Sequence, residues 1–128
     1  MAITSAICNS FKQEILQAEH NFTASSGNTF NLALYTSSAS LGASTTAYTT
    51  SNEVSGSGYT AKGNALTSVT PTLDSSTAVC DFADTSFTSA SFTARGCLIF
   101  NDSHSSDAAV CVIDFGSDKT VTSGTFTI

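Results

Sequence analysis

Short stretches in which every second residue is apolar recur along most of this chain. In residues 29–36, for example, Phe30, Leu32 and Leu34 are each followed by a residue of different size or polarity. A period of two is that of a β-strand, whose successive side chains point to opposite faces of a sheet. We therefore expect a half-buried strand here, with the three large apolar side chains in the core.

The second half of the chain repeats this alternation in runs that are separated by polar turns. Two runs, 95–100 and 109–115, are almost continuously apolar, as in central strands that are covered on both faces. Polar turns are expected at 101–107 and 116–120. The other expected strands are residues 59–66, 67–73, 78–82, an edge strand at 87–93, and a last strand from Val121 to Ile128.

Seven or eight short strands with a turn roughly every ten residues are typical of an antiparallel sandwich or barrel. A chain of 128 residues is long enough to bury a core, and nothing in its composition divides it into parts. The sequence thus predicts a mainly β protein: one domain over residues 1–128, an antiparallel, jelly-roll-like β-sandwich.

One segment, residues 5–19, has a helical pattern instead. Apolar residues recur at three- and four-residue steps from Ile3 to Leu16, and Thr4 or Ser5 is suited to cap the first turn. We expect a short N-terminal amphipathic helix. It would either cover one open end of the core or pack on a partner.

Residues 37–57 are rich in Ser, Thr, Gly and Ala and are expected to form a long loop. Long loops inside compact domains are often binding elements. The overlapping segment 46–63 has three glycines and almost no large aliphatic residue, and it offers the hydroxyls and rings of Tyr48 and Tyr59 and the carboxylate of Glu53. We expect it to be an ordered contact element that touches a neighbouring protein or the domain's own sheet.

The charge composition of the chain limits which kinds of macromolecule it can bind. The chain has 22 Ser and 20 Thr, a net charge of −6, and charged residues at only 11% of positions, against about 25% in an average domain. Its four basic residues are scattered, so no basic patch for nucleic acid or for an anionic membrane can form. They are Lys12, Lys62, Arg95 and Lys119.

No apolar run approaches the roughly 20 residues that span a bilayer, and the first residues lack a basic start followed by an apolar stretch. We therefore expect no membrane partner, and folding in the cytoplasm of the cell that makes the protein.

The four cysteines, Cys8, Cys80, Cys97 and Cys111, are separated by 72, 17 and 14 positions. This spacing contains no CxxC pair and matches no zinc pattern. Each cysteine lies in or beside an apolar run, so buried free thiols are expected. A disulfide between neighbouring strands is the alternative.

The candidate catalytic groups do not form a recognisable set. Asp81 and Asp114 end two expected strands beside a phenylalanine, where a carboxylate commonly caps a turn. His104 lies in a polar turn with Asp102 and Asp107, which is at most a weak cation site. The chain has no GxSxG and no phosphate-binding glycine motif. We expect no enzymatic activity, no cofactor and no metal.

Several stretches together give the chain a family resemblance. It resembles small virion structural proteins of tailed bacteriophages, over nearly its whole length. The stretches that carry the resemblance are residues 34–61, 81–84, 92–101 and 112–128, together with Phe11–Leu16 before His20–Phe22.

This resemblance implies a capsid decoration, or cement, protein on the outer surface of the virion, with the major capsid protein and copies of itself (a trimer or a dimer) as partners. The acidic balance fits a position away from packaged DNA. Two alternatives remain open: a tail, neck or fibre component, and a module that binds host glycans through Tyr35, Tyr48 and Tyr59. The residues expected to contact a partner are Phe11, Tyr48, Glu53, Val54 and Tyr59.

Overall fold

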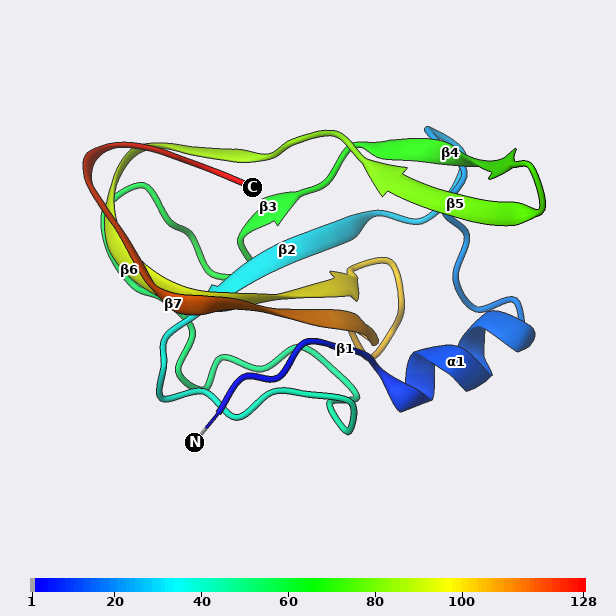
Figure 1. Ribbon diagram of the computed structural model, residues 1–128, viewed down its shortest axis with the longest axis horizontal. Helices are drawn as coiled ribbons and strands as arrows, with labels where there is room; N and C mark the ends of the chain where they lie inside the picture. The colour runs from blue at the N-terminus through cyan, green and yellow to red at the C-terminus, as the bar shows by residue number, and fades with distance from the viewer. Residues whose placement is uncertain (1) are drawn as a thin grey trace.

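The computed structural model describes residues 2–128, and within this range the protein is an antiparallel β-sandwich with one short N-terminal helix, as the sequence predicts (Figure 1). The larger sheet has the strand order β1-β7-β6-β2-β3, and β4 and β5 form a separate hairpin. The elements are β1 (Ala6–Ile7), α1 (Asn9–Leu16), β2 (Phe30–Tyr35), β3 (Asn64–Ala65), β4 (Ser68–Asp74), β5 (Thr77–Phe82), β6 (Ser86–Asn101) and β7 (Ala109–Thr127).

The second layer arises because the long β6–β7 hairpin bends back on itself (Figure 1). Between the pairs Ala94↔Lys119 and Gly96↔Asp114, β6 has one residue and β7 has four, so β7 bulges. Bulges bend a strand and increase its twist. Gly116 lies in this bulge at φ 80°, a left-handed conformation that glycine adopts without strain.

Arg95 lies opposite the bulge. Its guanidinium is 3.4 Å from the carboxylate of Asp114 and 3.5 Å from that of Asp118, so it bridges the two sides of the bend. The expected turn at 116–120 is therefore wrong, because β7 continues through it. The expected strands 87–93 and 95–100 are likewise halves of the single strand β6.

Hydrophobic residues pack on both faces of the larger sheet. On one face, the N-terminal stretch and residues 37–48 cover the rings of Tyr35 and Phe100. On the other face, Leu34 belongs to the same cluster as Phe87 and Phe92 of the bent-over half of the β6–β7 hairpin, and Phe30 stacks on Phe22. Every residue of β2 is buried, so the expectation of a half-buried strand is wrong: the Ser/Thr-rich segment covers its second face.

The helix is shorter than residues 5–19. Ala6 and Ile7 pair with β7, and α1 begins after Cys8, which caps it without a side-chain hydrogen bond. Ser5 is not the cap, because its hydroxyl accepts the backbone N–H of Asp114 at 2.8 Å.

No helix among residues 2–128 is long and apolar enough to cross a membrane. The expected strand 59–66 is reduced to β3.

Candidate functional site

The polar segment 46–63 lies along the edge of the protein's own sheet. The N–H of Thr36 donates to the carbonyl of Asn52 at 3.0 Å, and the N–H of Val54 donates to the carbonyl of Leu34 at 2.9 Å. These bonds continue the antiparallel pairing of β2 with β3 along the same edge. An edge strand with unpaired backbone groups is open to pairing with other chains, and this segment closes the edge.

A tyrosine hydroxyl takes the place of one missing backbone partner on this edge. The N–H of Leu34 donates to the hydroxyl oxygen of Tyr59 at 2.9 Å, where the carbonyl of a neighbouring strand would otherwise stand. The same hydroxyl donates its proton to Glu53 Oε1 at 2.6 Å. The ring of Tyr59 stacks on Phe87, so the side chain joins the two layers of the sandwich.

Glu53 is the centre of this arrangement, which we call the Glu53 network. Its Oε1 accepts both the Tyr59 hydroxyl and the N–H of Lys62 at 2.8 Å, and its Oε2 accepts the Tyr48 hydroxyl at 2.6 Å. Burial, followed by donation to this carboxylate, raises the pKa of Tyr48 to about 12 and the pKa of Tyr59 further. The carboxylate thus joins three points of the segment and leaves none of these donors free for a partner.

The segment ends in a sharp turn at Lys62 and Gly63. Gly63 has φ 66°, and a Cβ there would lie 1.8 Å from the carbonyl oxygen of Leu32, so only glycine fits. The Lys62 ammonium lies 2.9 Å from a carboxylate oxygen of Asp102 and 2.9 Å from one of Asp107. These hydrogen bonds raise the pKa of Lys62. The turn is therefore tied to the β6–β7 connection.

The structure separates the five expected partner-contact residues. Val54 is 5% exposed and belongs to the core. Tyr48, Glu53 and Tyr59 are bonded to one another on the sheet, which corresponds to the second of the two roles expected for the segment. Phe11, on α1, lies elsewhere and lines a groove.

The tyrosines considered for glycan binding do not form an exposed platform. Tyr35 is fully buried, and its hydroxyl donates to the carbonyl of Thr49 at 2.7 Å. The ring of Tyr48 stacks on Phe100 with centroids 4.9 Å apart.

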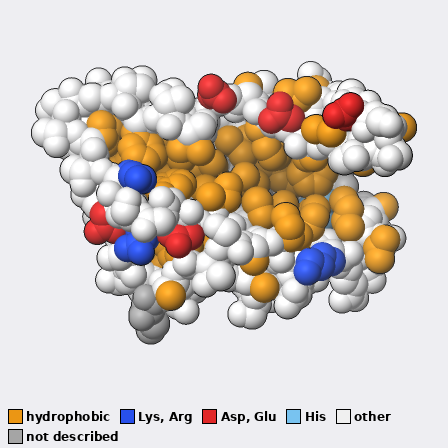
Figure 2. Space-filling view, viewed as in Figure 1, with side chains coloured by type: hydrophobic (Ala, Val, Ile, Leu, Met, Phe, Trp, Pro, Cys, Tyr) orange, Lys and Arg blue, Asp and Glu red, His pale blue; other side chains and the backbone are white. Residues whose placement is uncertain are grey.

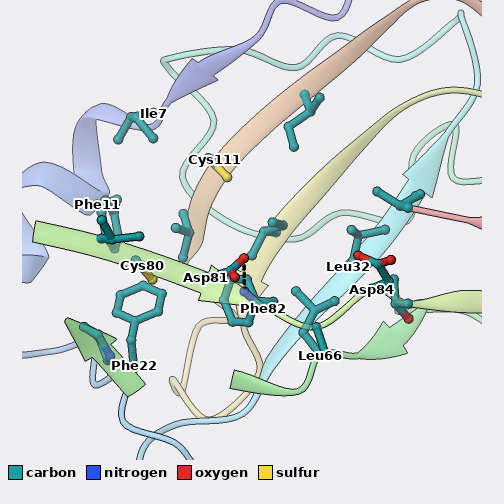
Figure 3. A pocket seen from close by; sticks show the side chains of 18 of the residues that line it. Ile7, Phe11, Phe22, Leu32, Leu66, Cys80, Asp81, Phe82, Asp84 and Cys111 are labelled. Atoms are coloured by element: carbon teal, nitrogen blue, oxygen red, sulfur yellow. Dashed lines mark hydrogen bonds between the residues drawn. The ribbon is translucent and has the colours of Figure 1, made fainter. Parts of the chain in front are cut away.

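An open apolar groove of about 620 Å³ lies between the larger sheet and the β4–β5 hairpin, beside α1 (Figures 2 and 3). Figure 2 shows its floor as a continuous field of hydrophobic atoms. Carboxylates lie only on the hairpin side, at Asp81 and Asp84. The residues that define it best are Ile7, Phe11, Phe22, Leu66, Phe82 and Cys111. Apolar clefts with few polar groups are typical of binding sites for apolar partners and for small molecules.

Large aliphatic side chains remain exposed around the groove. Ile7 is 49% exposed, Val79 40% and Ile113 39%, and Leu73 on the hairpin is 74% exposed. β7 was expected to be covered on both faces, but Ile113 is exposed because the groove leaves this part of the strand open. Of these residues, Ile7, Val79 and Ile113 line the groove, and an exposed apolar patch of this kind is typical of interaction sites.

The β4–β5 hairpin is the least covered part of the fold. Among residues 2–128, β5 pairs only with β4, and Thr77–Asp81 are all exposed. The hairpin is anchored at its base, where the ring of Phe82 packs against Phe22 and Phe30. A two-stranded hairpin is at best marginally stable on its own, so its distal part lacks a covering layer.

A cluster of Glu14, Glu19 and His104 places three possible metal ligands within 4.8 Å of one another. Both ring nitrogens of His104 already have hydrogen-bond partners. His104 Nδ1 accepts the N–H of Ser106 at 3.2 Å, so Nε2 carries the proton and donates to Glu19 at 2.9 Å. A metal on Nε2 would require the proton on Nδ1, facing another donor. The cluster therefore fits a structural network better than a metal site.

His20 is held in the same way. Its side chain is fully buried, and its Nδ1 lies 3.0 Å from the amide nitrogen of Asn101, whose oxygen accepts the N–H of Ser103. Nδ1 is therefore an acceptor, and Nε2–H donates to Glu14 at 3.0 Å. The helix and the β6–β7 connection are joined through these bonds.

The four cysteines are free thiols. Cys8 and Cys97 are buried and Cys111 is partly buried, but Cys80 is exposed on β5, contrary to expectation. Burial raises the pKa of Cys97 to about 12 and that of Cys111 to about 11, so neither is an activated nucleophile at neutral pH.

The carboxylates considered as a catalytic pair serve separate local roles. Asp81 accepts the N–H of Phe82 at 2.8 Å, and Asp114 pairs with Arg95.

Comparison of the chain with models of known protein families, with curated proteins and with solved structures finds no match. Function must therefore be inferred from the groove, the hairpin and the Glu53 network.

Proposed function

We propose that this chain is a non-enzymatic virion structural protein, and specifically a decoration protein that binds the outer surface of a tailed-bacteriophage capsid. The observation that carries the proposal is the apolar surface that the single chain leaves uncovered in the groove and on the β4–β5 hairpin. Subunits of assemblies expose such surfaces because a neighbour covers them.

The charge distribution supports the same role. The net charge is −6, and two of the four basic side chains, Lys62 and Arg95, are already paired with carboxylates. A surface of this kind repels DNA and suits a position outside the capsid. The sequence resemblance to small virion proteins is what selects a phage particle among possible assemblies.

The internal arrangement of segment 46–63 also fits a protein that must persist on a particle. The Glu53 network and the hydrogen bonds from the segment to β2 close the β2 edge, so this edge is not open to unintended pairing.

The test is to count and locate the protein in purified particles of the phage that encodes it. We expect hundreds of copies on the capsid exterior, detected by quantitative mass spectrometry and by accessibility to antibody. Particles that lack the protein should release DNA at a lower temperature. A count of tens or fewer would place the protein in the tail or neck, and absence from particles would overturn a virion role altogether.

A further inference from the structure

We propose that the free edge of β5 and the groove beside it form a two-fold interface with a second copy of this chain, in which β5 pairs antiparallel with β5 of the partner. This inference concerns the isolated protein and does not depend on the virion role. It joins two observations: a strand edge without a partner and an apolar groove left open next to it.

The strand edge is the first requirement. β4 is accompanied on its outer side by the loop before β2, since the N–H of Ala24 donates to the hydroxyl of Thr70 at 3.0 Å. β5 has no such neighbour among residues 2–128, and its residues Thr77–Asp81 are exposed. An unpaired edge of this kind accepts another strand through backbone hydrogen bonds.

A second copy of β5 can meet this edge symmetrically. Two antiparallel copies of one strand are related by a two-fold axis, so each gains the same contacts and the assembly closes. The two hairpins then form a four-stranded sheet, which removes the marginal stability of a hairpin on its own. Centring the pairing on Val79 or on Cys80 keeps opposite residues on the same face of that sheet.

The groove supplies the apolar contact. The exposed side chains of Val79 on the hairpin and of Ile113 on β7 both line the groove and extend its apolar surface. A stable interface covers about 800 Å² on each partner, more than a single strand edge provides. The hairpin of the partner, laid over the mouth of the groove, extends the contact beyond the strand edge.

The charges around the groove are complementary for this arrangement. The hairpin carries Asp74 and Asp81. The opposite side is formed by α1, in which the Glu14 carboxylate is bonded to His20 and Lys12 is the basic side chain. Figure 2 shows the acidic atoms above the groove and a basic group below it. A partner hairpin over the groove brings its own carboxylates towards Lys12, and the two-fold axis repeats this contact. Opposite charges of this kind favour the second copy over a small apolar ligand.

The first test is the mass of the purified full-length chain over concentrations from roughly 1 to 100 µM, a range that detects micromolar association. Sedimentation equilibrium should show the mass rising from 13.1 kDa towards twice that value. The variant Val79→Asp should weaken association at least tenfold. Its control is Leu16→Asn, which adds no charge beside Lys12. Leu16 is 88% exposed and lies outside the groove lining, so this control should leave association unchanged.

Cys80 provides a second test that does not depend on a destabilising substitution. Pairing centred on Val79 or Cys80 places the two Cys80 residues opposite or diagonal to one another, with Cβ atoms within about 8 Å. A short bismaleimide should therefore link two chains, and Cys80→Ser should abolish the link. Circular dichroism and the melting temperature should show that all variants remain folded.

Three results would overturn the proposal. The first is a mass of 13.1 kDa at every concentration, including the case of a monomer that takes up a fatty acid in the groove. The second is equal weakening of association by Val79→Asp and Leu16→Asn. The third is a crosslinked dimer that persists in Cys80→Ser, because the contact would then lie elsewhere.

Discussion

Segment 46–63 and the β4–β5 hairpin each differ from what their composition suggests: the first looks like a binding loop and the second like part of the core. The segment is polar and rich in glycine, as exposed binding loops are, yet its two tyrosine hydroxyls bond to its carboxylate, and one of them also bonds to β2. The hairpin has the alternation of an ordinary half-buried strand pair, yet it leaves Leu73 and Val79 in solvent. Polarity in a sequence does not by itself mean solvent, and apolar alternation does not by itself mean core.

The difference arises from what each region finds beside it. The segment runs along an unpaired sheet edge, where the Tyr59 hydroxyl replaces a missing backbone partner. A buried polar group that is fully bonded costs little free energy. The hairpin extends past the end of the larger sheet, so the single chain has no layer left to cover it. We infer that the first region serves the fold of the chain and the second its assembly.

The largest expected effect is that of removing the Glu53 carboxylate. Glu53→Ala leaves two tyrosine hydroxyls and the N–H of Lys62 without their hydrogen-bond acceptor. It should lower the free energy of unfolding by about 3 kcal/mol or more. Urea denaturation followed by circular dichroism measures this change. Asp74→Ala, which removes a carboxylate from the hairpin, should change stability by less than about 0.5 kcal/mol. Equal effects of the two substitutions would contradict the claim that segment 46–63 stabilises the fold more than the hairpin does.

A smaller loss of stability is expected when only one tyrosine hydroxyl is removed. Tyr59→Phe keeps the ring but leaves the N–H of Leu34 without its acceptor, and should cost about 1–3 kcal/mol. The matching backbone readout is hydrogen exchange at Leu34, which should become faster. An unchanged exchange rate at Leu34 would mean that the hydroxyl does not seal the β2 edge.

The pH dependence of Tyr48→Phe provides a third prediction, with a loss of about 1 kcal/mol at neutral pH. The pKa of Tyr48 is raised to about 12 in the folded protein, against about 10 when unfolded. A raised folded pKa gives stability that is complete below pH 10 and is lost as pH rises towards 12. The native protein should therefore lose more stability than Tyr48→Phe between pH 10 and 12, so the difference between them should shrink. If the free energies of unfolding of the native protein and of Tyr48→Phe changed in parallel between pH 10 and 12, the hydrogen bond from Tyr48 to Glu53 would be contradicted.

The smallest expected effect is on the hairpin. Leu73→Ser replaces a side chain that is 74% exposed, and should change the stability of the dilute monomer by no more than about 0.5 kcal/mol. A buried leucine such as Leu34 should cost about 2–5 kcal/mol when changed to alanine. Thermal melts at low protein concentration distinguish the two. A large loss from Leu73→Ser would show that the hairpin is covered within a single chain.

The strand pattern of this fold could be read from the sequence to a large extent. Period-two alternation located β2, β4 and β5, and the continuous apolar run located the buried half of β6. The bend at Gly116 could not be told from a turn, because glycine and polar residues are common to both. The start of α1 was misplaced because pairing of Ala6–Ile7 with β7 outweighs the helical periodicity of those residues.

The candidate site was less predictable, because it also depends on contacts between residues that are far apart in the sequence. The sequence singled out Tyr48, Glu53 and Tyr59 as chemically unusual, but their bonding partners are set by tertiary position along β2. The groove has no sequence signature, since Ile113 and Val79 belong to runs that look like core. Only the absence of a covering layer makes these residues a surface.

Amide hydrogen exchange at two protein concentrations tests the central claim most directly. Slow exchange follows from stable backbone hydrogen bonds. We predict slow exchange at Val54 and Lys62 at both concentrations. At Thr77–Phe82 we predict fast exchange when the protein is dilute and protection when it is concentrated. Fast exchange throughout segment 46–63, together with β5 protection that does not depend on concentration, would contradict the assignment of these regions to fold and assembly.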